Sequence, residues 1–432
     1  MKRMSKENLN YNNRTNRGVT LTKAEAIGDW LADFSKRENM AIYGGSLSKR
    51  NRIVLEAIAR CYGNIGVIII HNNPGLINDI SRIIKLFPGL YQRLAKQGGR
   101  VSQCHISGDN MLYEPLYGMN RERIVETIYP QLSMDNPSYM QQHKCSDALN
   151  CYIDILEGKN EIIDLDAILS IVNMDVETIE KECFSASSGR LGASSYEQND
   201  VSVYDRERIF SLLKQDNISF QVRADVNAFA SHLDGRIWQK RHEEATNVSI
   251  ISAVEMKNIL SIYTPSNTYV LDYLASEINS LMDKGKHFML VLDSINVSNT
   301  VLNTQILKAP TLPFSVVLSA DSIQSVFGDS ENDAQYSLHK MNTAVIMNCP
   351  NAKTAEVYSG SIGQYLRQFE SVNNGTSQGA FSPFAGMNKG TGIHEQLFDR
   401  IRPEEFTTLE GGAVLLSQDE KGFHVVKTNY LG

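Results

Sequence analysis

The chain contains several short, continuous runs of apolar residues, each followed by glycine or other turn-forming residues. The first two are "NMAIYGG" (39–45) and Val67 to His71 in "GVIIIHNNPG"; between them, "RIVLEAIARCY" (52–62) has the apolar spacing of a helix. Strand, glycine turn, helix and strand together form a βαβ unit. Because the apolar runs are continuous rather than alternating, they predict parallel strands with both faces covered.

Similar runs return in the second half of the chain, at 258–264, 287–295, 314–320, 342–349 and 412–417. Between them and the first strands the pattern changes to helical segments such as "RERIVETIYPQL", "CSDALNCYIDILEG" and "DLDAILSIV". We therefore predict an α/β core made of residues 19–118 and 250–432, with an all-helical insertion at 119–249. The Ser/Asn/Gly-rich stretch from Ser371 to Gly390 predicts a loop.

Charge and composition narrow the class of protein. The chain has 432 residues, 42 Lys and Arg against 49 Asp and Glu, and no apolar run of membrane-spanning length. Residues 1–18 are basic, whereas the chain as a whole is mildly acidic, and they predict a flexible basic tail. This stretch contains one glutamate and five basic residues: Lys2, Arg3, Lys6, Arg14 and Arg17. The six cysteines match no zinc or CxxC pattern, so a reducing, cytoplasmic compartment is expected.

The turn after the first strand, "YGGSLSKRN", stands where a nucleotide-binding protein carries its phosphate loop. In the pattern GxxxxGK[ST], glycines turn backbone amides onto the phosphates while the lysine and the hydroxyl reach the terminal phosphate and Mg²⁺. Here Gly44 takes the first glycine, followed by Gly45, whereas Lys49, Arg50 and Asn51 replace the second glycine, the lysine and the hydroxyl. These five residues are the candidate nucleotide-binding residues, and an ordinary strand-to-helix turn is the alternative.

A second candidate is Asp293, which ends the apolar run "FMLVLD". In phosphate-loop ATPases an acidic residue at such a strand end helps to hold Mg²⁺, and a glutamate that follows polarises the attacking water. The next residue here is Ser294, so the expected general base is absent. Asp293 is therefore the candidate catalytic and magnesium-binding residue, and a helix cap is the alternative.

Five stretches resemble the type IV secretion coupling proteins, the TraG/TraD-like branch of the FtsK/HerA hexameric ATPases. The loop "GGSLSKRN" is similar to their GGTGSGKT-like run, and "DNMLYEPLYGMN" to their YNPL segment, with Glu114 in place of the asparagine. "SIQSVFG" and "NTAVIMNCPNAKTAEVYSGSIGQ" are similar to two consecutive family motifs, and "FDRIRPEEFTTLEGGAVLLSQDEKGFHVVKTNYL" to the family's C-terminal ending. The likeness covers residues 35–120 and 250–432.

The resemblance implies a RecA-like core that handles ATP and Mg²⁺ and works as an oligomer on DNA or a secreted protein. The family's nucleotide-sensing glutamine falls near Leu318 or Ser319, which adds a further substitution to those in the loop and after Asp293. With both phosphate-loop ATPase motifs (Walker A and Walker B) degenerate, we expect ATP hydrolysis to be weak or absent. Partners would hold the chain at the inner face of the membrane, in a ring of identical subunits or together with an active ATPase.

Two other functions stay open from the residues alone: an active ATP-driven DNA translocase, and a non-enzymatic scaffold that pairs with an active paralogue. Arg400 and Arg402 in "DRIRPEEF" are candidates for contacts to a neighbouring subunit's phosphate. The alternative for this pair is a surface salt bridge with Glu404 or Glu405.

Overall fold

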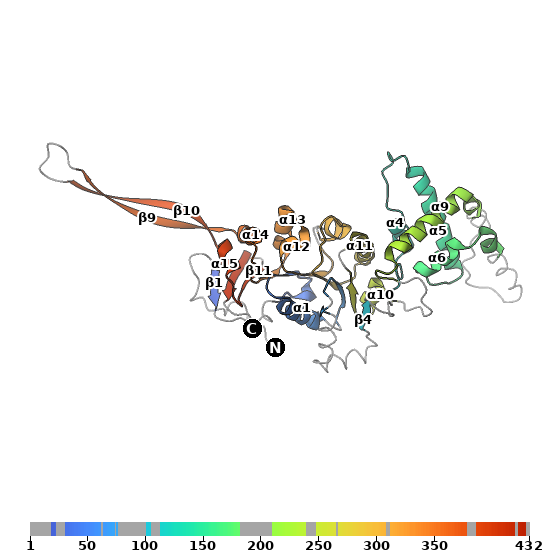
Figure 1. Ribbon diagram of the computed structural model, residues 1–432, viewed down its shortest axis with the longest axis horizontal. Coiled ribbons are helices and arrows are strands. Elements are labelled where there is room, and N and C mark those ends of the chain that lie inside the picture. Colours follow the sequence, from blue (N-terminus) through green and yellow to red (C-terminus); the bar gives the residue numbers. More distant parts are fainter. Residues whose placement is uncertain are drawn as a thin grey trace. The chain divides into compact units, whose positions relative to one another are not determined.

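The computed structural model divides the chain into two compact units, one made of residues 1–57 and 317–432 and the other of residues 58–316. It describes residues 19–22, 31–61, 64–73, 75–76, 101–104, 113–181, 210–238, 248–264, 267–307, 312–377, 386–419 and 422–428 (Figure 1). The predicted basic tail, residues 1–18, lies outside them. No helix among the described residues is long and apolar enough to span a membrane.

The first unit contains six neighbouring strands, in the order β1 (Val19–Thr22), β12 (Gly422–Thr428), β11 (Ala413–Asp419), β8 (Thr343–Ile346), β2 (Met40–Tyr43) and β7 (Ser315–Ala320). β2 pairs in parallel with both β7 and β8. Its four residues are all buried, as the continuous apolar run predicts. The 3₁₀ turn η4 (Phe34–Lys36) precedes β2.

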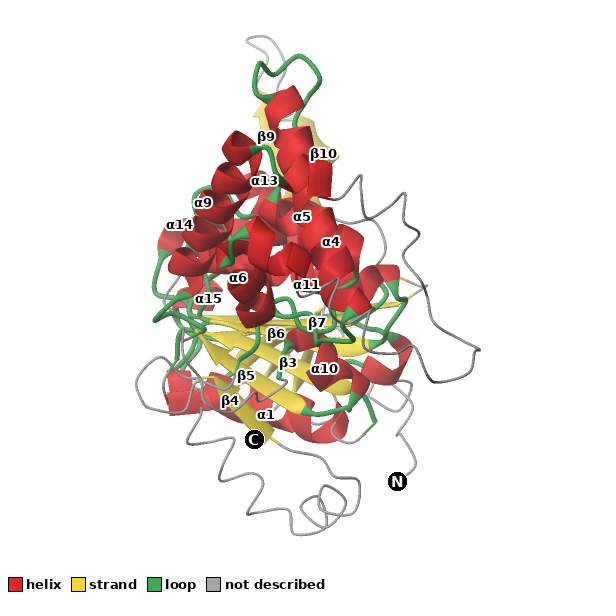
Figure 2. Cartoon of the chain, turned by 90° about the vertical axis from the view of Figure 1, so that its right-hand side faces the viewer, coloured by secondary structure: helices red, strands yellow, loops and turns green. Residues whose placement is uncertain are grey.

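Helices cover both faces of these strands. On one side lies α1 (Leu47–Cys61), and on the other lie α12 (Ile323–Phe327), α13 (Glu331–Lys340) and α14 (Ala352–Ile362) (Figures 1 and 2). The short helix α15 (Pro403–Thr407) precedes β11 and packs against α14. The predicted strand–turn–helix arrangement at the start of the chain is thus confirmed.

The stretch from Ser371 to Gly390, predicted as a loop, is largely strand. β9 (Gln364–Ser377) and β10 (Gly386–Asp399) pair along their full length as an antiparallel ribbon of two strands (Figure 1). The loop prediction was wrong because it relied on local composition. A strand rich in Ser, Asn and Gly can still form when every residue has a paired backbone partner.

The second unit contains four parallel strands in the order β6 (Phe288–Asp293), β3 (Gly66–His71), β5 (Ile259–Tyr263) and β4 (Val101–Cys104). Helix α10 (Ile250–Glu255) packs against β3 and against α11 (Thr268–Asp283). Close packing with α10 requires Gly66, since a Cβ there would lie 2.6 Å from Val254 Cα. A π-helical segment, η5 (Leu302–Leu307), follows β6.

Between residues 121 and 238, the regular elements that the structure describes are helices. They include α4 (Arg121–Ile128), α5 (Tyr139–Gly158), α6 (Leu165–Asn173) and α9 (Asp216–Leu233). Asn120 and Asp164 cap α4 and α6 through their side chains. The fold class is therefore confirmed as α/β, with a mostly parallel sheet and a helical segment. The predicted domain boundaries remain predictions.

Candidate functional site

The glycine turn lies at a strand-to-helix junction, between the end of β2 at Tyr43 and the start of α1 at Leu47. Gly44 and Gly45 have φ values of 77° and 66°, a region that favours glycine. A Cβ on Gly44 would lie 2.5 Å from Asn348 O, and one on Gly45 would lie 2.9 Å from Met347 Sδ. Both glycines are therefore required by the backbone angle and by close packing against the end of β8.

The amides of this turn bind neighbouring backbone rather than pointing together into the loop. Gly44 N–H donates to Ala320 O at 3.1 Å, and Gly45 N–H donates to Asn348 O at 2.9 Å. A phosphate loop binds its ligand by turning consecutive amides inward onto the anion. In this turn, two of those amides are already used by the ends of β7 and β8.

Arg50 turns back into the loop. Its side chain is buried, and Nη1 donates to Gly44 O at 3.2 Å and to Gly45 O at 3.0 Å. A guanidinium carries donors only, and here Nη1 is engaged by carbonyl oxygens of the turn. Asn51 is also buried, whereas Lys49 is exposed. The position that should meet a phosphate thus carries a cation already held by the backbone.

A cavity of about 330 Å³ opens beside the turn. Three segments of the first unit line it: the start of α1, the residues after β8, and the turn after α15. Its lining residues are Gly45, Ser46, Lys49, Met347, Asn348, Pro350, Leu409, Glu410, Gly411 and Gly412. Lys49 and Glu410 are its charged residues, so the wall carries no net positive charge with which to attract a triphosphate.

Asp293 ends β6 in the second unit, at the same edge as the end of β3. Its side chain is fully buried, and Oδ2 accepts a hydrogen bond from Asn73 Nδ2 at 2.9 Å. Asn73 is itself fixed, since its Oδ1 accepts from Gly75 N–H at 3.0 Å. Asn72 N–H donates to Asp293 O at 3.1 Å, and Ser294 has a φ of 58°. Asp293 therefore joins the ends of β3 and β6.

His71, at the end of β3, extends this buried cluster. Its Nδ1 lies 2.9 Å from Asn73 O, and its Nε2 lies 3.0 Å from Ser261 Oγ on β5. No group of three or more His, Cys, Asp or Glu side chains among the described residues is arranged to hold a metal ion. Around the turn and around Asp293, the groups that the family resemblance assigns to ATP and Mg²⁺ are bonded to protein atoms.

The two candidate arginines belong to the segment between β10 and α15. Arg400 N–H donates to Gly363 O at 3.1 Å, and Arg402 is exposed. Arg402 N–H donates to Glu405 Oε2 at 2.9 Å, and Glu405 Oε1 forms an ion pair with Lys427 at 3.0 Å. Lys427 is thus one cationic partner of Glu405, and the proposed contact of the arginines to a neighbouring subunit stays a prediction.

Sequence reasoning missed the residues that complete both sites. Asn73 follows β3 in "HNNPG". A side-chain amide just after a buried strand could have indicated a hydrogen-bond partner for Asp293. Gly411 and Gly412 were visible as a glycine pair in "LEGGA". Met347 and Asn348 gave no local signal, since their role depends on β8 lying next to β2.

Comparison with known proteins gives matches at the level of structure only. No protein-family model and no curated protein matches the chain. Among solved structures, it is similar to the bacterial conjugative coupling protein TrwBΔN70 in its unbound form, with a TM-score of 0.42 and 13% identity over 94% of this chain and 88% of that one. TrwB in complex with ADP and Mg²⁺ has a TM-score of 0.41 and 11% identity over the same shares.

VirB4 of Thermoanaerobacter pseudethanolicus is similar over 77% of this chain and 84% of that one, with a TM-score of 0.35 and 14% identity. The similar structures thus include a coupling protein, the class that the sequence resembles. At these identities the likeness concerns the path of the chain. The chemistry of this protein has to be argued from its own residues.

Proposed function

We propose that this chain is a coupling-protein-like subunit of a conjugative or type IV secretion apparatus, which engages DNA or a secreted protein and hydrolyses ATP weakly or not at all. Weak or absent hydrolysis is supported by Arg50, whose guanidinium is bonded to the carbonyls of Gly44 and Gly45 inside the turn. The coupling-protein-like role is supported by the sequence resemblance over residues 35–120 and 250–432.

The geometry supports loss of hydrolysis at two places. In the turn, a cation lies inside the loop and the amides of Gly44 and Gly45 are bonded to neighbouring backbone, whereas a phosphate loop turns its amides onto the anion. At the end of β6, Asp293 is buried, and its Oδ2 accepts a hydrogen bond from Asn73. Ser294 cannot replace the missing carboxylate as a general base. In this role the chain assembles with copies of itself or with an active ATPase that supplies the energy.

The proposal is tested by titrating the purified chain with ATP and Mg²⁺ in a calorimeter and by measuring phosphate release. We expect a dissociation constant no tighter than about 1 mM. Turnover should stay well below the roughly 1 s⁻¹ of an ordinary enzyme. Phosphate release at an ordinary ATPase rate, lost on Asp293→Ala, would overturn the inactive assignment.

Two arginine variants show whether the turn has the structure described. Arg50→Ala removes hydrogen bonds from a charged donor and should destabilise the first unit by about 3 kcal/mol. Arg52 lies exposed on the same helix, so Arg52→Ala is the matched control and should change stability little. Equal effects of the two substitutions on the unfolding midpoint would show that Arg50 does not hold the turn.

A further inference from the structure

The helical segment, residues 121–238, is joined to the strands of the second unit through two crossings of the chain. Residues 113–120 lead into it and residues 248–250 lead out of it. Tyr113 and Val248 form a parallel β-bridge, and Glu114 N–H donates to Val248 O at 2.7 Å. Ser249 Oγ donates to Tyr117 O at 2.7 Å. The two crossings therefore lie side by side and bind each other, and together they are called the neck of the helical segment.

One buried carboxylate binds both crossings. Glu277 lies on α11 with none of its side chain exposed. Its Oε2 accepts from Tyr113 OH at 2.6 Å, on the incoming crossing, and from Ile250 N–H at 3.1 Å, on the outgoing one. Ile250 is the first residue of α10, so the same oxygen also binds the N-terminus of that helix.

The second oxygen of Glu277 extends the network to a third point. Oε1 accepts a hydrogen bond from Tyr273 OH, one turn earlier on α11. The Tyr273 hydroxyl in turn accepts from Leu116 N–H at 2.9 Å, on the incoming crossing. The carboxylate thus receives three donors, and one of them relays the interaction to a fourth.

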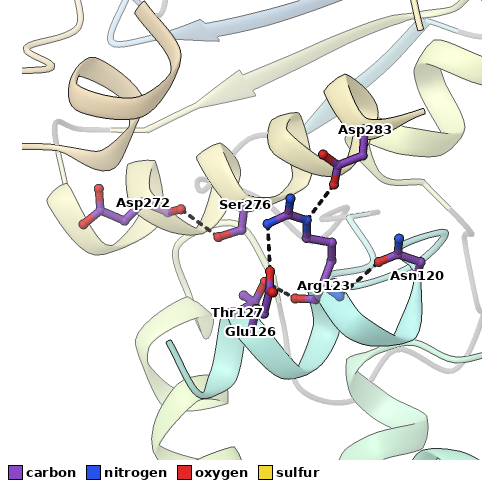
Figure 3. Close-up of polar contacts among 7 residues, drawn as sticks. All are labelled: Asn120, Arg123, Glu126, Thr127, Asp272, Ser276 and Asp283. Atoms are coloured by element: carbon purple, nitrogen blue, oxygen red, sulfur yellow. Dashed lines mark hydrogen bonds and ion pairs between the residues drawn. The ribbon is translucent and has the colours of Figure 1, made fainter. Parts of the chain in front are cut away.

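Other contacts around the crossings are closer to solvent. Arg123 of α4 donates to Asp283 at the end of α11 at 2.6 Å and to Glu126 at 2.7 Å (Figure 3). Lys284 Nζ donates to Gly118 O at 2.9 Å. The side chains in the Arg123 pairs are all about one-third or more exposed, so solvent and salt weaken them. A buried carboxylate that satisfies donors from both crossings has no such screening.

We propose that Glu277 is the latch of the helical segment, a positioning residue that fixes the segment on the strands by binding both crossings at once. If it is removed, the Tyr113 hydroxyl and the Ile250 amide lose the same acceptor. The two crossings then loosen together, although they are more than 130 residues apart in sequence. The proposal does not depend on whether the chain hydrolyses ATP.

Ionisation of the latch should act on the same contacts. Burial raises the pKa of Glu277 to about 7, against the opposing effect of hydrogen bonds from Tyr113 and Tyr273. The titratable or charged groups that face the neck from each packed element are Tyr113 and Glu114 on the incoming crossing, Tyr273 on α11, Glu255 on α10, Arg123 on α4, and Asp283 and Lys284 at the end of α11. Opening the neck hydrates Glu277 and lowers its pKa again, so a rise in pH through neutrality favours opening.

The test is amide hydrogen exchange of the full chain, corrected for the intrinsic pH dependence and read in peptides covering 113–120 and 248–256. Tyr113→Phe removes one donor without leaving a cavity and should speed exchange roughly tenfold in both peptides, because the two crossings share one acceptor. Asp283→Asn is the control in the exposed pair and should leave the 248–256 peptide unchanged. Faster exchange in 113–120 alone would overturn the latch.

Glu277→Gln tests the link to ionisation and keeps the volume of the side chain. In the native chain, corrected exchange of 248–256 should rise between pH 6 and pH 8, whereas in Glu277→Gln it should be flat. A rise of equal size in both proteins would show that another group controls the neck and would overturn the role of Glu277 in its pH response.

Discussion

At the scale of single residues, Arg50 changes what the glycine turn can bind. A guanidinium stays charged at physiological pH and offers donors in a fixed plane. Here it bonds the carbonyl oxygens of Gly44 and Gly45, so the turn accepts a cation from its own chain rather than an anion from solution. The same glycines that would make a phosphate loop therefore serve a closed structural turn.

Gly44 gives the sharpest test of this turn. Gly44→Ala adds a Cβ 2.5 Å from Asn348 O at a φ of 77°, so it combines backbone strain with a clash against main chain. Gly285→Ala is the control, because its φ of 62° is also positive while no heavy atom lies within 4 Å of the added Cβ. We expect a loss of about 1–2 kcal/mol for the control and clearly more for Gly44→Ala. Chemical denaturation measures both, and equal losses would mean that the turn is not packed against β8.

Features of the site that depend on neighbouring residues in the sequence could be predicted, and features that depend on contacts between distant residues could not. The positions of Gly44 and Asp293 at strand ends could be predicted, because continuous apolar runs mark buried strands and the turn residues follow directly. The direction of the Arg50 side chain could not, since sequence gives no information on whether a cation faces a ligand or its own backbone. The bond between Asn73 and Asp293 joins residues 220 positions apart and needs the strand order.

At the scale of elements, the β9–β10 ribbon shows the limit of composition as a guide. The stretch 371–390 has many Ser, Asn and Gly residues, each of which has low strand propensity. Within the part of this stretch that the structure describes, pairing from Gln364↔Asp399 to Ser377↔Gly386 supplies backbone partners along β9 and β10. Helices with their own caps are easier to predict than this ribbon, because a cap and an apolar stripe lie within one short window of sequence.

The cap of α4 provides a test at this scale. Asn120 Oδ1 accepts from Arg123 N–H at 3.0 Å, at the point where the incoming crossing becomes helix (Figure 3). Asn120→Ala should cost about 1 kcal/mol, and Asn120→Asp should cost less because it keeps the acceptor and adds a favourable charge. Thermal unfolding of the second unit measures both. An Asp variant as unstable as the Ala variant would rule out capping as the cause.

At the scale of the whole molecule, three buried charged groups are bonded to neighbours within their own unit. In the first unit Arg50 bonds backbone carbonyls, and in the second Glu277 and Asp293 accept hydrogen bonds from neighbouring side chains. A buried charge without partners would cost several kcal/mol, so these contacts let the described fold stand without a bound ligand. A core that needed ATP and Mg²⁺ for its integrity would leave such groups to be neutralised by the ligand.

Burial of Glu277 makes the free energy of unfolding fall as pH rises through neutrality. Burial raises the pKa of Glu277 from 4.5 to about 7, so between these values the folded chain holds a proton that the unfolded chain has released. The stability from this proton is complete below pH 4.5 and is lost as pH rises through 7. Glu277→Gln cannot titrate, so the stability of this variant relative to the native chain should increase across that window by up to about 3 kcal/mol and then level off. Denaturant unfolding measures the difference at each pH, followed by the emission of Trp238, which is buried in the same unit, with Trp30 replaced by Phe in both proteins. A difference that stays constant from pH 5 to pH 8 would mean that Glu277 keeps one protonation state throughout.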